Sequence, residues 1–136
     1  MKTSITILAG LLFSGILVID GTIDAIASDA TQAVAGGGVT VKVTYLNPKG
    51  SDGPRFQVAL DTHSINLDSY DLKTISVLRD DDGNTYSPTA IENKGSAHHR
   101  EATVSFANGA SGTKRVELVI KDVAGVKERI FRWDLE

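Results

Sequence analysis

The chain of 136 residues contains no cysteine, and its single methionine is Met1. Disulfide bonds are therefore excluded, together with a thiolate nucleophile, a zinc–thiolate site and the cysteine and methionine ligands of blue-copper proteins. A lipid anchor attached to cysteine is excluded for the same reason. The domain must depend on its apolar core, which a chain of this length can build.

An excess of positive charge is also lacking. The sequence has 14 lysines and arginines against 17 aspartates and glutamates, which gives a formal net charge of −3. Domains that bind nucleic acid usually carry a clear basic excess on one face. The composition therefore predicts that nucleic acid is not a partner of this protein.

The N-terminal segment has the composition of an export signal. Lys2 supplies a positive start, residues 5–19 form an apolar run, and Ala25-Ile26-Ala27 has the A-x-A pattern of a cleavage site. The run of 15 residues is shorter than the roughly 20 that a membrane-spanning helix needs. We predict a signal peptide over residues 1–27 and a periplasmic or extracellular protein. Cleavage after Ala30 and retention of the segment as a membrane anchor are the alternatives.

The remainder of the chain changes from small polar residues to a two-residue alternation of apolar and polar side chains. Residues 28–38 end in three glycines and predict a flexible lead-in, so the folded domain is expected over residues 39–136. Alternation that begins at Val39 is typical of half-buried strands. We predict strands over 39–45, 55–61, 72–79, 85–87, 102–106, 116–121 and 131–135.

Short alternating strands separated by turn residues predict an all-β fold. We expect an immunoglobulin-like antiparallel β-sandwich of about seven strands that follows the signal segment. Trp133 is expected to be the largest buried side chain. Long loops are predicted at residues 47–54, 62–71 and 88–99, and loops on a rigid sandwich commonly carry recognition.

Three segments carry a resemblance to known proteins. They are Leu60-Asp61-Thr62-His63-Ser64, His98-His99-Arg100, and residues 119–129 with the following Phe131-Arg132-Trp133. On these segments the chain resembles small exported bacterial β-sandwich domains of unassigned function, over roughly residues 39–135. The resemblance implies a compact exported sandwich and implies no activity.

The three histidines form the first candidate site. His63 follows one predicted strand, and His98 and His99 precede another. Three imidazoles can hold copper or zinc, with Asp61 or Glu101 as a fourth ligand. Neighbouring residues in extended chain point to opposite sides, so His98 and His99 can share an ion only in a loop conformation. The alternative is that these histidines brace a loop or are simply exposed.

Asp80, Asp82 and Asn84 form the second candidate site, because oxygen ligands at alternate positions beside Gly83 resemble the start of a calcium loop. The later bidentate glutamate is out of register in this sequence, since Glu92 lies one position beyond the usual spacing. A hairpin turn at Asp81-Asp82-Gly83-Asn84 explains the segment without an ion.

Catalytic motifs are not recognisable in the sequence. Asp61, His63 and Ser64 lie at one strand end and do not form a triad by proximity in sequence, and no G-x-S-x-G motif occurs. We therefore predict a protein that is not an enzyme, and the sequence assigns it no definite cofactor. The prediction is an exported interaction or accessory module of the cell envelope, whose partner is another envelope or extracellular protein. A periplasmic copper- or zinc-binding protein is the alternative.

Overall fold

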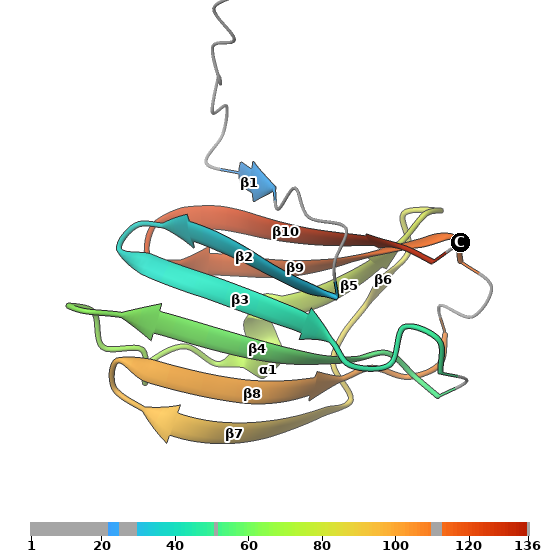
Figure 1. Ribbon diagram of the computed structural model, residues 1–136. Coiled ribbons are helices and arrows are strands. Elements are labelled where there is room, and N and C mark those ends of the chain that lie inside the picture. The colour runs from blue at the N-terminus through green and yellow to red at the C-terminus, as the bar shows by residue number, and fades with distance from the viewer. Residues whose placement is uncertain (1–21, 25–29, 51, 110–112, 136) are drawn as a thin grey trace, which may run out of the picture.

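The computed structural model describes residues 22–24, 30–50, 52–109 and 113–135. In these residues the chain forms ten strands and one short helix, and the strands make two five-stranded sheets (Figure 1). All strand pairs are antiparallel except β1 with β10. The prediction of an all-β sandwich is confirmed, and the strands are more numerous than the seven expected.

The first sheet has the order β2-β3-β4-β8-β7. Its strands follow one another as hairpins except for the step from β4 to β8, which leaves the sheet and returns to it. Their bounds are Thr31–Gly36 for β2, Val39–Tyr45 for β3, Arg55–Thr62 for β4, His99–Ser105 for β8 and Ala90–Ser96 for β7.

The second sheet has the order β1-β10-β9-β5-β6. The helix α1, Leu72–Ile75, contacts β9 in this sheet and also β7 and β8 in the first sheet. The strand bounds are Thr22–Asp24 for β1, Val126–Asp134 for β10, Arg115–Val123 for β9, Ser76–Asp80 for β5 and Thr85–Tyr86 for β6.

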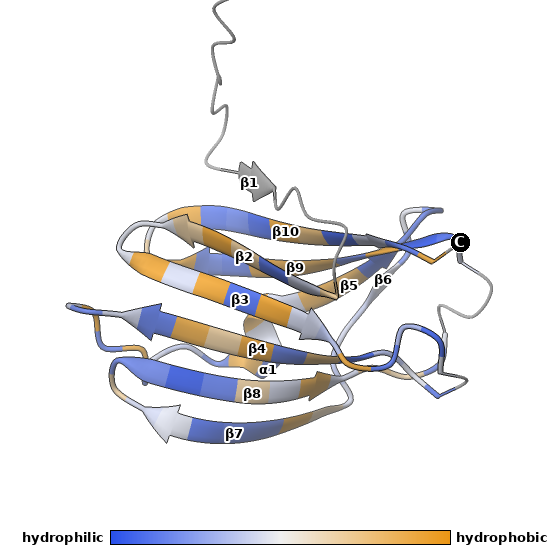
Figure 2. Ribbon diagram, viewed as in Figure 1, coloured by the Kyte–Doolittle hydropathy of each residue, from blue (hydrophilic) through white to orange (hydrophobic). Residues whose placement is uncertain are grey.

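The core lies between the two sheets, and the alternation in the sequence explains which side chains fill it. Val39, Val41 and Val43 of β3 are buried, whereas Thr40 and Lys42 between them are exposed. The same two-residue period appears as alternating colours along β3 in Figure 2. Five aromatic residues pack together in this core: Tyr45, Phe56, Phe106, Phe131 and Trp133.

The expected flexible lead-in is wrong for residues 31–36, because these residues form β2. Each of them pairs with a residue of β3, and the sandwich therefore begins at Thr31 rather than Val39. Val34 and Gln32 are buried, and both side-chain oxygen and nitrogen of Gln32 bond to the backbone of Arg132 in the other sheet. Gly37 and Gly38, both with positive φ, make the tight turn between β2 and β3.

The loop expected at residues 88–99 is also corrected, since β7 occupies Ala90–Ser96. Only Ile91 and Ala90 in this strand are apolar, so the two-residue signal is too weak to recognise without the pairing to β8. The strand expected over 72–79 begins as α1 instead. The carboxylate of Asp71 accepts hydrogen bonds from the backbone N–H of Lys73 and the hydroxyl of Thr74, which favours a helical turn there.

The predicted signal peptide lies outside the described residues except for β1. Residues 22–24 pair in parallel with residues 128–130 of β10. No helix in the described part of the chain has the length and apolar content needed to cross a bilayer.

Candidate functional site

Several turns meet at one end of the sandwich. The register pairs Val39 with Thr62 and Asp61 with His99. The β2–β3 turn, the end of β4 and the β7–β8 turn therefore lie at the same end of the first sheet. The β9–β10 turn lies beside them, because a Cβ placed on Gly37 would fall 2.0 Å from the carbonyl oxygen of Ala124. We call residues 61–71 and 97–99, with the turns at 37–38 and 124–125, the histidine end.

Thr62 starts the loop of the histidine end. Its backbone N–H donates to the carbonyl of His98 at 3.0 Å, and its hydroxyl donates to the carbonyl of Gly38 at 2.8 Å. The same hydroxyl oxygen accepts the backbone N–H groups of Ser64 and Ile65, each at 3.3 Å. A threonine of this kind fixes the local turn, and it connects the loop to both neighbouring hairpins.

Arg100 is the first of two buried arginines that hold this end together. Its side chain is 9% exposed, and Nη1 donates to the carbonyls of Leu67 at 2.8 Å and Tyr70 at 2.5 Å. Nη2 donates to Oδ1 of Asn93 on β7 at 3.0 Å. One guanidinium group therefore satisfies two loop carbonyls and joins the loop to the edge strand.

Arg129 is the second buried arginine and is 0% exposed. Its Nη1 donates to the carbonyl of Val123 at 2.8 Å, and its Nη2 donates to the carbonyl of Gly36 at 2.6 Å. Val123 immediately precedes the β9–β10 turn of the second sheet, and Gly36 immediately precedes the β2–β3 turn of the first sheet. Tyr70 adds a further connection, because its hydroxyl accepts the backbone N–H of Ala124 at 3.0 Å.

The sequence analysis does not predict that either arginine is buried, although a signal for it exists. By the two-residue alternation, Arg129 falls on the same face of its strand as Phe131 and Trp133, which are expected in the core. Arg100 likewise falls on the same face as Ala102 and Val104. A long cation in an apolar phase is costly to bury unless it is hydrogen-bonded. Such a residue therefore indicates a set of carbonyls that only the folded chain supplies.

The predicted histidine ligands all lie at the histidine end, but their side chains do not form one cluster. His63 and His98 are exposed, and His99 contacts Asp61 instead of another imidazole. Among the described residues, the only three potential metal-ligating side chains with ligand atoms within 4.8 Å of one another are Asp80, Asp81 and Asp82. The register thus brings the three histidines to one end without placing their rings around a common point.

His99 forms a charge-assisted pair on the outer face of the first sheet. Its Nδ1 hydrogen bonds to Oδ1 of Asp61 on β4, and its Nε2 lies 3.7 Å from Oε1 of Glu101. The hydrogen bond with Asp61, reinforced by the negative charge of that carboxylate, raises the pKa of His99 above 6.5. Nε2 faces a carboxylate rather than a hydroxyl group, so the pair is not aimed at a nucleophile.

We expect an NMR pH titration of the His99 ring protons to show this raised pKa. Because the folded-state pKa is raised, the stabilisation from the pair is complete below about pH 6.5 and is lost as the pH rises through the folded-state value. Asp61→Asn should return the His99 pKa toward 6.5, and Glu101→Gln should lower it less. An unshifted His99 pKa in the unsubstituted protein would contradict the pairing.

The acidic turn of the second candidate site is held by its own hydrogen bonds. Both oxygens of Asp80 accept bonds, from the backbone N–H groups of Asp82 and Asn84, the amide of Asn84 and the hydroxyl of Tyr86. Burial opposes ionisation of Asp80, but the hydrogen bonds from Asn84 and Tyr86 outweigh it and lower its pKa. The Asn84 nitrogen points at Asp80, and Gly83 has positive φ, as the predicted hairpin turn requires.

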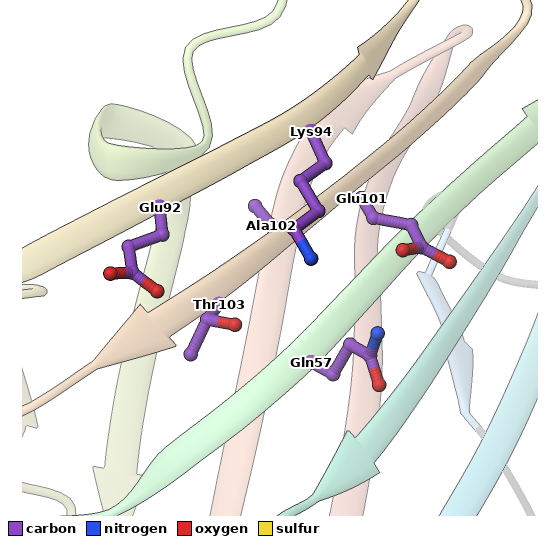
Figure 3. A pocket seen from close by; sticks show the side chains of 6 residues that line it. All are labelled: Gln57, Glu92, Lys94, Glu101, Ala102 and Thr103. Atoms are coloured by element: carbon purple, nitrogen blue, oxygen red, sulfur yellow. The ribbon is translucent and has the colours of Figure 1, made fainter.

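A shallow polar depression lies on the outer face of the first sheet and includes Glu101, whose carboxylate lies 3.7 Å from Nε2 of His99. Figure 3 shows its lining side chains above β4, β8 and β7. Glu92 and Lys94 of β7 stand beside each other on this face, opposite Thr103 and Glu101 of β8. The other lining residues are Gln57 and Ala102.

Donors and acceptors at the histidine end therefore belong to loops whose backbone is fixed by Arg100, Arg129 and Tyr70. Its exposed groups are imidazoles, carboxylates and hydroxyls, which can make hydrogen bonds and ion pairs with another molecule. No protein-family model, curated protein or solved structure matches this chain.

Proposed function

We propose that this chain is an exported, non-catalytic interaction module of the cell envelope, and that its histidine end binds another envelope or extracellular protein. The observation that supports this proposal most strongly is the pair of buried arginines beneath exposed loops. Arg100 and Arg129 together hold four carbonyls from three segments: two in the 62–71 loop, one at the end of β2 and one at the end of β9.

Fixing a loop before binding reduces the entropy that is lost when a partner orders it. The fixed loops of this end carry exposed polar side chains, which a partner could contact without rearranging the sandwich. These exposed residues are Asp61, His63, Ser64, Asn66, Asp68, His98 and His99. A rigid scaffold with polar loops at one end is a common arrangement for recognition.

Capture from envelope extracts tests the proposed surface. We expect the protein to recover a specific partner, and we expect the double variant His63→Asp/His98→Asp to lose it. Both histidines are exposed, so the variant should keep the fold. Lys49→Glu is the matched control, because Lys49 is exposed in the loop after β3, at the opposite end of the sandwich. Equal capture by the double variant and the unsubstituted protein would contradict the assignment of this surface.

Export is tested separately by the mass of the protein recovered outside the cytoplasm. We expect the mass of residues 28–136, or of 31–136 if cleavage follows Ala30. Cleavage after Ala27 would also remove β1 from the edge of β10. Recovery of the uncleaved chain in the cytoplasm would contradict the export proposal.

Copper or zinc binding is the second candidate function, and the register favours it to the extent that His63, His98 and His99 share one end of the sheet. An ion would require the three rings to turn toward one another, with Asp61 or Glu101 completing the site. Calorimetric titration with Cu(II) and with Zn(II) tests this. Affinity that is unchanged after all three histidines are replaced by alanine would refute it.

A further inference from the structure

Within the residues that the structure describes, β7 stands at one edge of the first sheet. β7 is the end of the order β2-β3-β4-β8-β7, so only one of its two edges is paired within the described residues. Its seven residues are exposed except Ile91, which is half-buried. β7 and the adjoining part of β8 form a hydrophilic margin of the sheet (Figure 2).

The ladder determines which backbone groups of β7 face this open edge. Thr62 donates to the carbonyl of its register partner His98, so the hydrogen-bonded pairs between β4 and β8 fall on the even-numbered residues of β8. The odd-numbered residues of β8 then bond to β7, through residues 90, 92, 94 and 96. The N–H and C=O groups of Ile91, Asn93 and Gly95 therefore point outward.

A second copy of β7 can satisfy these groups in an antiparallel arrangement centred on Asn93. A two-fold axis through Asn93 lets the backbone of each Asn93 donate to and accept from the other. Gly95 has a φ of +75°, outside the extended region, so its pairing across the axis is expected to be distorted and the regular ladder to be short. We expect a weak dimer for this reason, since a short edge contact buries less than the surface typical of stable complexes.

The side chains are complementary in the same register. Pairing about Asn93 places Glu92 of one chain directly opposite Lys94 of the other. By the two-fold symmetry, Lys94 of the first chain also lies opposite Glu92 of the second. Both side chains stand on the outer face of the sheet, where Figure 3 shows them on β7. Charges on an edge strand usually discourage pairing, but here the two signs are arranged so that self-pairing brings opposite charges together.

We infer that two copies of this protein associate through β7, forming one continuous sheet across the dimer with Glu92–Lys94 pairs on both sides of the axis. The inference does not depend on the proposed export or on the histidine end. That end remains exposed in the dimer, since β7 contributes its open edge and not its loops.

Sedimentation velocity on the full chain, from about 10 µM to about 1 mM, tests the inference. We expect a reversible monomer–dimer equilibrium in this range. Glu92→Lys should raise the dissociation constant about tenfold or more, because both attractive pairs become lysine–lysine contacts. The double variant Glu92→Lys/Lys94→Glu restores opposite charges with their order reversed, and its dissociation constant should return to within about threefold of the original.

Lys42→Glu is the matched control, because Lys42 is exposed on the outer face of β3, which β4 and β8 separate from β7. Its dissociation constant should equal that of the unsubstituted protein, and far-UV circular dichroism should confirm that each variant is folded. A chain that stays monomeric at about 1 mM would overturn the inference. Dimerisation that is unaffected by Glu92→Lys, or not restored in the double variant, would overturn it equally.

Discussion

Replacing Arg129 with methionine is expected to lower the free energy of unfolding by about 3–5 kcal/mol. Methionine has similar length and fills the site, but it donates no hydrogen bond. The carbonyls of Gly36 and Val123 would be left without their donor in a site where the arginine is 0% exposed. Each buried carbonyl that loses its partner costs about 1–3 kcal/mol. Urea denaturation followed by tryptophan fluorescence measures the loss.

Arg132→Met is the matched control on the same strand. Arg132 is half-buried and its Nε donates to Oε1 of Glu117 at 3.0 Å, while Arg79 donates to the other oxygen of the same carboxylate at 2.8 Å. Loss of one partner from this surface network should cost about 1 kcal/mol or less. Similar losses for Arg129→Met and Arg132→Met would show that the buried arginine does not hold the two sheets together.

Replacing Trp133 with alanine is expected to cost about 3–5 kcal/mol, enough to unfold a domain of ordinary stability. The side chain is 5% exposed and lies at the centre of the aromatic cluster. Its ring centroid is 5.3 Å from that of Phe56 and 5.6 Å from that of Tyr45. Truncation leaves a cavity between the two sheets, and the surrounding strands can collapse into it only partly.

Trp133→Phe keeps most of the buried volume and should lose less than half as much stability. Leu46→Ala is the surface control, because Leu46 is 44% exposed and its truncation should change stability by about 0.5 kcal/mol or less. Thermal unfolding followed by circular dichroism compares the three variants. A Trp133→Ala protein as stable as Leu46→Ala would contradict the central role of the aromatic cluster.

The predictions that succeeded concern strands buried on one face. β3 was predicted over 39–45 and forms there, and β4 ends one residue beyond its predicted limit. In these strands valine, leucine or phenylalanine recurs at every second residue, and one-sided burial follows from that period alone. β7 carries no such pattern because all of its residues except Ile91 are exposed, so its existence depends on hydrogen bonds to a strand that follows it in sequence.

The candidate site was predictable only in part. A site shared by His63, His98 and His99 is one of two hypotheses from the sequence, and the register places the three residues at one end of the sheet. The orientation of their rings was not predictable, because Asp61 holds His99 across the sheet and is 38 residues away in sequence. The asparagine and aspartates of the 80–84 turn were recognised as a turn because their hydrogen bonds are local.

By itself, the sequence determined the all-β class, the buried face of the regular strands and the dependence of stability on an apolar core without disulfides. These properties follow from local periodicity and composition, which a chain carries before it folds. Only the tertiary structure decided that Thr31–Gly36 is a strand, that Arg100 and Arg129 are buried, and that β7 stands at the end of the strand order of its sheet. Each of these depends on backbone carbonyls or N–H groups contributed by distant segments, and no local pattern reports where those groups will lie.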